Sequence, residues 1–358
     1  MASVTLLAKL STPSGLWPLI INGINSGVLN FGWTIVIFTL IVKIAMSPFD
    51  FLMRWSTKKT TLMQKKLQPQ IEKINKKYAN DRQKANIQTQ ALYKREGMNV
   101  YSSCLISILY IALTMVVFFT LFADLRKYAA YEAVYQYDVM EQKYDAVLDE
   151  TGDTTAAKEA AAQIWTQNKD GWLWVKNIWR ADTQVNPMPT YKDLKSLVSS
   201  GSYKSVSEKF KEIDQDKYAQ VTSAVAKSEN RGWNGYYILA VLAVGLTFLS
   251  QFVSELGNKV ERKKKDRINK FYQVEDDKNK AKSQPSAGSM KLLKYILPII
   301  MAIFVITSSA AFGIYIVVSS AASILINLLI NYLVKICTKK QELEVLAVLE
   351  KQEKKNAK

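Results

Sequence analysis

The chain has 358 residues, of which 49% are hydrophobic and 22% are charged, and its formal net charge is +17. It contains no histidine and two cysteines, which excludes histidine-based acid–base catalysis, Ser-His-Asp and Cys-His nucleophiles, and the usual histidine ligands of zinc. A soluble protein this basic suggests a nucleic-acid partner, but the apolar residues are clustered in long runs, which indicates a membrane protein instead.

Five apolar runs have the length of about 20 residues that is needed to cross a hydrocarbon core of about 30 Å. Buried helices of a large soluble α-protein are the alternative, but Lys and aromatic residues flank the runs, as they do at membrane interfaces. We therefore predict an all-α membrane protein with transmembrane segments at 31–53, 101–124, 236–256, 292–312 and 313–336. The last two form one tract, which a tight turn near Phe312-Gly313 would divide.

Residues 1–30 precede the first span and contain Trp17 among apolar residues mixed with Gly and Asn. An amphipathic segment in the outer membrane interface and a disordered tail both fit this composition. In either case we expect residues 1–30 to be extracytoplasmic, because Lys9 is their only charged side chain.

The first span contains Lys43 about ten residues from either end, or roughly 15 Å at 1.5 Å per residue. A charged residue at such a depth costs about 2.5–3.5 kcal/mol on insertion scales, so it is a functional-site hypothesis by default. The alternative is that the long side chain reaches an interface, which this distance disfavours. We predict that Lys43 faces a polar cavity between helices.

The connection 54–100 is basic, with 12 Lys or Arg residues and 3 acidic residues. Apolar residues recur in it at helical spacing: Met63, Leu67, Ile71, Ile74 and Tyr78. The sequence Asn-Asp-Arg at 80–82 then breaks the helix, and a second helix is expected to end at Gly97. We predict a helical hairpin in the cytoplasm, with a merely solvated loop as the alternative.

Residues 125–235 form a long, nearly neutral segment with 15 basic and 16 acidic residues. The run "TTAAKEAAAQIWTQNK" favours a helix, and "GWLWVKNIW" is typical of a segment at a membrane interface. The weak apolar content of the remainder predicts a largely helical extracytoplasmic insert that acts as a modest lid or spacer.

The positive charge is concentrated in alternate connections, since residues 257–291 hold 11 basic and 5 acidic residues and residues 335–358 hold 7 and 4. This distribution predicts that the N-terminus lies outside and the C-terminus inside, with 257–291 a basic cytoplasmic loop and 337–358 a basic cytoplasmic tail. Contact of the tail with RNA or a ribosome would be an addition to the membrane function.

Polar residues within two other spans are candidates for lining a cavity around Lys43. The third span contributes Thr247, Ser250 and Gln251, and the fifth contributes Ser319, Ser320, Ser323, Asn327 and Asn331 at near-helical spacing. Ser and Thr in spans are often only packing groups. Together with a buried lysine, however, they predict a hydrated, positively charged groove that is open to the cytoplasm.

Several stretches resemble the YidC/Oxa/Alb family of membrane protein insertases. The first span, "GWTIVIFTLIVKIAMSPF", resembles the first core span of that family, and "LQPQIEKINKKYANDRQKANIQTQALYKREGMNVYSSCL" resembles its cytoplasmic hairpin. "GWLWVKNIW" is similar to the segment outside the third core span, and "AAFGIYIVVSSAASI" to the final-span motif. The resemblance covers about residues 31–123 and 171–336, and the hairpin is its most specific part.

The resemblance implies that Lys43 occupies the family's basic position, which is usually arginine, and that Tyr315 belongs to the final-span motif. It also implies a client-receiving role for hairpin residues: Gln68, Pro69, Lys77, Tyr78, Lys84, Tyr93 and Lys94. The chain departs from the family where the usual Pro-Ala-Gly-Leu becomes Ser-Ala-Ala-Phe at 309–312. Such changes suggest a divergent bacterial paralogue with a narrower set of clients.

The predicted function is a membrane protein insertase or chaperone of the cell membrane. Its expected partners are newly made membrane proteins and the lipid bilayer, with a ribosome or a translocon as further candidates. The sequence has neither a GxxxxGK[ST] loop nor a Rossmann glycine pattern, so we expect no cofactor, no metal and no enzymatic reaction. A non-catalytic assembly scaffold is the main alternative, and a transporter that uses Lys43 as an anion site is a weaker one.

Overall fold

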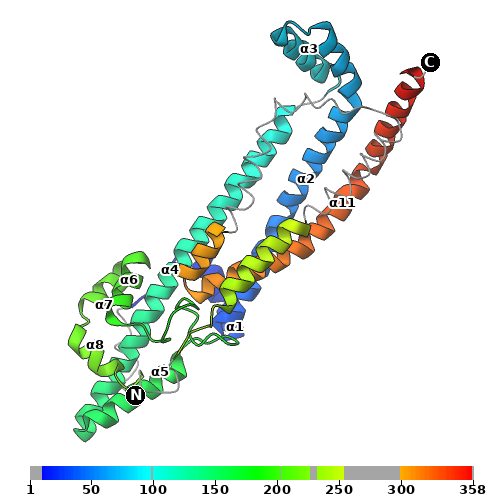
Figure 1. Cartoon of the computed structure of the whole chain (residues 1–358). Coiled ribbons are helices and arrows are strands. Elements are labelled where there is room, and N and C mark those ends of the chain that lie inside the picture. The colour runs from blue at the N-terminus through cyan, green and yellow to red at the C-terminus, as the bar shows by residue number, and fades with distance from the viewer. Residues whose placement is uncertain (1–9, 98–99, 202, 226–231, 254–298, 357–358) are drawn as a thin grey trace. The chain divides into compact units, whose positions relative to one another are not determined.

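The computed structural model describes residues 10–97, 100–201, 203–225, 232–253 and 299–356. Most of these residues are helical, and none of them forms a β-strand, so the all-α prediction is confirmed for this part of the chain (Figure 1). The helices are α1 (Leu16–Val28), α2 (Phe31–Lys77), α3 (Arg82–Arg95), α4 (Val100–Thr151), α5 (Thr154–Asn168), α6 (Tyr191–Gly201), α7 (Lys204–Lys211), α8 (Gln215–Thr222) and α11 (Ala310–Asn356), with further helical segments at Ile238–Val253 and 299–307.

Among the residues that the structure describes, three helical segments are long and apolar enough to cross a membrane, namely Phe31–Lys77, Cys104–Thr151 and Ala310–Val348. The spans predicted at 31–53, 101–124 and 313–336 fall within α2, α4 and α11. The third predicted span contains the shorter apolar helix Ile238–Val253, and the beginning of the fourth lies outside the described residues. The count of five spans and their orientation therefore stay predictions.

The chain forms two compact units whose boundaries fall inside the long helices. The first unit comprises residues 1–42, 118–250 and 282–322, and the second comprises 43–117, 251–281 and 323–358. The insert and the beginnings of α2 and α11 belong to the first unit. Lys43, the α2–α3 turn and the remainder of α11 belong to the second.

Within the first unit, the short helix α1 packs against the beginning of α2 and the middle of α4. Ile21 is 1% exposed, the Trp17 ring meets Phe38 edge-on at 5.8 Å, and the Trp17 Nε1 donates a hydrogen bond to Thr120 Oγ1 at 2.8 Å. Residues 16–28 are thus an ordered helix with a packed face, which favours the amphipathic alternative for this segment.

The insert has an apolar core of its own, built on the second half of α4. Tyr137 and Met140 of α4, Trp165 of α5 and Tyr218 of α8 are all at most 2% exposed, and the rings of Tyr137 and Tyr218 lie 4.6 Å apart. Val206 of α7 is also fully buried in this cluster. The insert is therefore a folded element, whereas its weak apolar content predicted only a modest lid or spacer.

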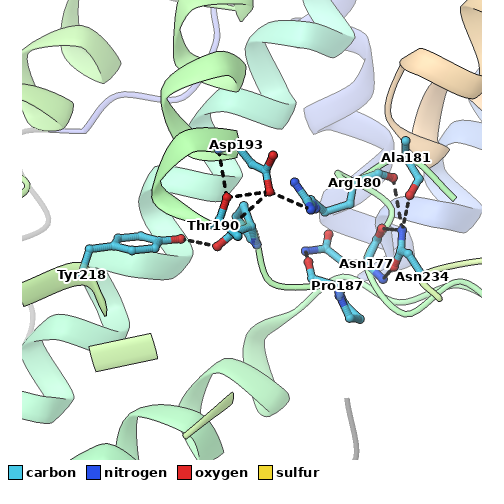
Figure 2. Close-up of polar contacts among 9 residues, drawn as sticks. Asn177, Arg180, Ala181, Pro187, Thr190, Asp193, Tyr218 and Asn234 are labelled. Carbon is cyan, nitrogen blue, oxygen red and sulfur yellow. Dashed lines mark hydrogen bonds and ion pairs between the residues drawn. The ribbon is translucent and has the colours of Figure 1, made fainter. Parts of the chain in front are cut away.

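A loop at residues 170–190 connects α5 to α6 and is held by buried amides (Figure 2). The Asn234 Nδ2 donates to the carbonyl oxygens of Asn177 and Ala181 at 2.8 and 3.1 Å, and the Asn177 backbone N–H donates to Asn234 Oδ1 at 2.9 Å. Arg180 forms an ion pair with Asp193 of α6 at 3.2 Å. These bonds fix the loop although it contains no regular structure.

This loop determines where α11 begins. The first N–H groups of a helix have no partner within it. In α11 the N–H groups of Ala310 and Ala311 donate to the carbonyl oxygens of Arg180 and Ile178, both at 2.7 Å. The helix therefore starts where the loop supplies acceptors.

As a result, the turn inside the last apolar tract lies a few residues earlier than predicted. Helical structure is interrupted at Ser308 and Ser309, and α11 runs on from Ala310. Phe312 and Gly313, where the sequence predicted the turn, lie within the first turns of α11.

In the second unit, α3 packs against the last part of α2. Leu67 of α2 and Leu92 of α3 are 1% and 5% exposed, and Ile71 and Tyr93 pack around them. The Asp81 carboxylate caps α3 by accepting a hydrogen bond from the Lys84 N–H at 3.0 Å, which satisfies one of the unpaired donors of the first turn. The break predicted at 80–82 is present, because α2 ends at Lys77 and α3 begins at Arg82.

Candidate functional site

Lys43 lies on α2 and is half-buried. Its Nζ donates a hydrogen bond to the Oγ of Ser323 on α11, at 3.0 Å. The ammonium is therefore held by a hydroxyl of another helix, an arrangement that differs from a side chain extended along its own helix toward an interface. Ser323 was one of the residues predicted to line a polar site around Lys43.

Arg54 makes a second polar contact between the same two helices. Its Nε donates to the Asp50 carboxylate on α2 at 2.9 Å. On α11 its Nη1 donates to Asn331 Oδ1 at 3.1 Å and its Nη2 to Asn327 Oδ1 at 2.5 Å. Asp50 is 8% exposed and Asn327 is 9% exposed, so this cluster is mostly shielded from the surroundings.

The polar residues form matched rows on the two helices. Lys43, Ser47, Asp50 and Arg54 are spaced by four, three and four residues, which places them on one face of α2. Ser323, Asn327 and Asn331 follow one another by four residues on α11. We call the following set the polar track: Lys43, Asp50, Arg54, Ser323, Asn327 and Asn331.

Pro48 lies inside α2 and removes the N–H that would bond the carbonyl of Ile44. The Ser47 Oγ donates to that carbonyl oxygen at 2.8 Å and so replaces the missing bond. The helix therefore continues past the proline. Because it is continuous, Asp50 and Arg54 stay in register with Lys43.

The two cations of the polar track have different surroundings. Arg54 is paired with a carboxylate and uses three nitrogens of its planar fork at once, which is the geometry that makes guanidinium contacts strong. Lys43 bonds a neutral hydroxyl and forms no ion pair within the part of the chain that the structure describes. With Asp50 as the one carboxylate of the set, the formal net charge of the track is +1.

Other predicted lining residues lie elsewhere in the structure. In the first unit the Thr247 Oγ1 donates to the carbonyl oxygen of Ala243 on its own helix at 2.6 Å, and it lies 3.4 Å from Ser320 Oγ. Tyr315 is 7% exposed and hydrogen-bonds with Ser319.

Two predicted lining residues of the third span have less definite surroundings. Ser250 is half-buried, and no contact of its hydroxyl is described. The Gln251 Oε1 is buried without a hydrogen-bond partner among the described residues. Of the residues predicted to line a site around Lys43, the structure joins Ser323 to Lys43 directly, while Asn327 is bound to Arg54.

A family model described as "60Kd inner membrane protein" matches residues 23–339 of this sequence. The chain belongs to this family. The family is the YidC/Oxa family, so the resemblance carried by the span and hairpin motifs is confirmed. Membership in the family, together with three helices able to span a bilayer, places the chain in the cell membrane.

Curated relatives carry the name "Membrane protein insertase YidC". That of Fusobacterium nucleatum is 38% identical over 107 residues, which is 30% of this chain and 48% of the relative. That of Caldanaerobacter subterraneus is 33% identical over 108 residues, again 30% of this chain and 48% of the relative, and that of Thermotoga maritima is 38% identical over 86 residues, or 24% and 18%. The match thus spans about half the length of the first two relatives, and no solved structure matches the chain significantly.

The hairpin residues implied by the YidC/Oxa resemblance divide into two groups. Tyr93 is half-buried in the α2–α3 cluster, and Pro69 lies inside α2 without interrupting it. Gln68 bonds Glu72 on its own helix at 3.2 Å. Tyr78 in the turn is half-buried, with the Lys77 Nζ 5.5 Å from its ring centroid, whereas three lysines are exposed: Lys77, Lys84 and Lys94. Their role in receiving clients stays a prediction.

Asp50 and Arg54 are the residues that the sequence reasoning missed. They fall at the end of the span predicted at 31–53. The available signal was their spacing, since both continue the helical face that begins at Lys43.

Proposed function

We propose that this YidC/Oxa protein is a membrane protein insertase and chaperone that passes short polar segments of client proteins along Lys43 and releases client helices sideways into the bilayer. The observation that carries the proposal is the contact of Lys43 with Ser323 at 3.0 Å. It gives a half-buried cation in the apolar part of α2 that forms no ion pair among the described residues.

The physical problem of insertion is the passage of polar residues through hydrocarbon. A charged side chain at the centre of a bilayer costs about 2.5–3.5 kcal/mol on insertion scales. A hydrated groove with one fixed cation would shorten the apolar distance and attract acidic residues of the translocating segment. The apolar client helix then enters the lipid because of its own hydrophobicity. No nucleotide, metal or covalent intermediate is required.

The proposal also includes the number and orientation of the spans. Five spans place the N-terminus outside and the C-terminus inside, so the basic hairpin α2–α3 stands in the cytoplasm and receives clients there. Its exposed lysines, including Lys77, Lys84 and Lys94, also attract anionic lipid headgroups. The basic tail after residue 336 is available to a ribosome, and a translocon is a further candidate partner.

Reconstitution into liposomes tests the proposal. The client is a single-span protein with an acidic outer tail, and its insertion is measured by protection of the tail from protease. Lys43→Ala should lower insertion about tenfold, the equivalent of about 1.4 kcal/mol of lost attraction. Lys43→Arg should retain insertion because it keeps the charge. Lys335→Ala, which removes an exposed lysine of α11, is the matched control.

The same assay separates the alternatives. Flux of a small anion that depends on Lys43, without insertion of the client, would support a transporter instead. Binding of the client without either activity would support an assembly scaffold. Equal insertion by the wild type and by Lys43→Ala would contradict the role given to the lysine.

A further inference from the structure

The Arg54 guanidinium has partners of two kinds. Asp50 is on the same helix one turn away, and it is the partner that carries a charge. Asn327 and Asn331 come from α11 and present neutral amide oxygens at 2.5 and 3.1 Å. The two asparagines hold the guanidinium in place whichever carboxylate it binds, because their bonds use nitrogens other than Nε.

Electrostatics explains why a carboxylate lies beside the Arg54 guanidinium. A cation that is largely shielded from water is costly to leave unpaired, and the Arg54 side chain is 24% exposed. Asp50, whose side chain is 11% exposed, removes that cost while no client is present. A client carboxylate that took its place would keep Arg54 paired, while Asp50 stays on α2 and has to be hydrated there.

We propose that Arg54 is a second anion-binding position of the polar track, and that Asp50 occupies it between clients as a stand-in for a client carboxylate. This inference rests on the proposed insertase function and names its substrate class, which is a translocated segment with two acidic residues. One client carboxylate displaces Asp50 from Arg54, and the other binds the ammonium of Lys43, whose described hydrogen bond is to the neutral Ser323 hydroxyl.

The spacing of the two cations sets the spacing of the acidic residues. Lys43 and Arg54 are eleven residues apart on a continuous helix, or about 16 Å at 1.5 Å per residue. An extended client segment covers that distance in about five residues at 3.3–3.6 Å each. Two carboxylates about five residues apart therefore reach both cations, whereas two adjacent carboxylates reach one.

Asp50 also sets the selectivity of the track. It competes for Arg54 from its own helix, and therefore at a high effective concentration. Clients with neutral tails gain nothing from Arg54, and singly acidic clients bind Lys43 first. Removing the Asp50 charge while keeping its shape should therefore favour acidic clients specifically.

The test uses the full-length protein in liposomes and three clients that differ only in the outer tail. One tail is neutral, one has two adjacent Asp residues, and one has two Asp residues about five positions apart. Wild-type protein should insert the client with the spaced pair about threefold better than the client with the adjacent pair. A gain of this size is expected for one additional ion pair that is only partly buried. Arg54→Gln should abolish this advantage and Arg54→Lys should keep most of it.

Asp50→Asn should raise insertion of the client with the spaced pair about threefold and leave the neutral client unchanged. Glu344→Gln and Lys339→Gln make the same charge changes on exposed positions of α11 and serve as matched controls. Thermal unfolding of each variant, followed by tryptophan fluorescence, shows whether it is folded. If Arg54→Gln is unfolded, the comparison of Asp50→Asn with Glu344→Gln decides the question.

The outcomes separate this inference from the proposed function. If Lys43→Ala loses insertion but Asp50→Asn behaves like its control with every client, Arg54 is a structural residue and the inference is wrong. The same conclusion holds if wild-type protein treats the spaced and adjacent pairs alike. If Lys43→Ala also retains insertion, the failure belongs to the proposed function.

Discussion

Glu132 shows how a single carboxyl can make the stability of the insert depend on pH. It lies on α4 beyond the apolar part of that helix and is 8% exposed. Burial raises the pKa of the Glu132 carboxyl well above its ordinary value, and the negative charge of Asp170 raises it further. Burial also raises the pKa of Asp170, although the hydrogen bond that this carboxylate accepts from Trp179 Nε1 at 2.6 Å opposes the shift.

We predict that Glu132→Gln stabilises the protein at alkaline pH. A carboxyl whose pKa is raised by folding binds its proton more tightly in the folded state, so the free energy of unfolding falls as pH rises from the unfolded pKa through the folded one. The amide has no such dependence. The melting temperature in detergent should therefore be similar for both proteins near pH 4 and higher for the variant at pH 8. The expected difference is about 2–4 °C for each kcal/mol by which the free energy of unfolding of the variant exceeds that of the wild type.

Glu159→Gln changes an exposed carboxyl of α5 and is the control for this comparison. It should follow the wild-type curve at every pH. A melting temperature for Glu132→Gln that runs parallel to the wild type between pH 4 and pH 8 would show that this carboxyl does not titrate differently on folding.

At the scale of elements, the beginning of α11 depends on tertiary structure. Ser308 and Ser309 directly precede α11, but no Ser, Thr, Asp or Asn side chain is described as capping the helix. The carbonyl oxygens of Ile178 and Arg180 take that role through the N–H groups of Ala311 and Ala310. The family's usual Pro-Ala-Gly-Leu is compatible with this arrangement, since its proline falls at position 309, which is not one of the two donors.

We predict that Ala311→Pro destabilises the protein by about 1–2 kcal/mol. Proline is tolerated in the first turn of an isolated helix, but here it removes the N–H that donates to the buried carbonyl of Ile178. Ser309→Pro removes neither donor and is the matched variant. Denaturant unfolding of both proteins measures the difference, and equal midpoints would show that the loop carbonyls do not stabilise α11.

At the scale of the whole molecule, the insert and the hairpin are expected on opposite sides of the membrane. The insert carries a core of its own around Tyr137 and Trp165, and the hairpin carries a smaller one around Leu67 and Leu92. The positive charge is concentrated near the hairpin and the tail, which predicts that both are cytoplasmic and that the insert is outside.

Thiol labelling in intact cells checks this topology. In a background with Cys104→Ser and Cys337→Ser, the thiol introduced by Glu159→Cys in the insert should react with a membrane-impermeant maleimide. The thiol introduced by Glu344→Cys in the last part of α11 should react only after the membrane is permeabilised. Both positions are exposed, so access is decided by the bilayer. Labelling of both thiols from the same side would rule out an odd number of spans between them.

The sequence by itself determined the properties that depend on local pattern. Apolar run length and charge asymmetry indicated an all-α membrane protein, and the motifs around Lys43 and the hairpin indicated its family. Only the tertiary structure decided which polar residues meet. It joined Lys43 to Ser323, bound Arg54 to Asp50 and two asparagines, and began α11 at the loop carbonyls. The physical reason is that hydrophobic pattern and helix spacing are set within one segment, whereas a hydrogen bond between α2 and α11 depends on how residues about 280 positions apart are packed together.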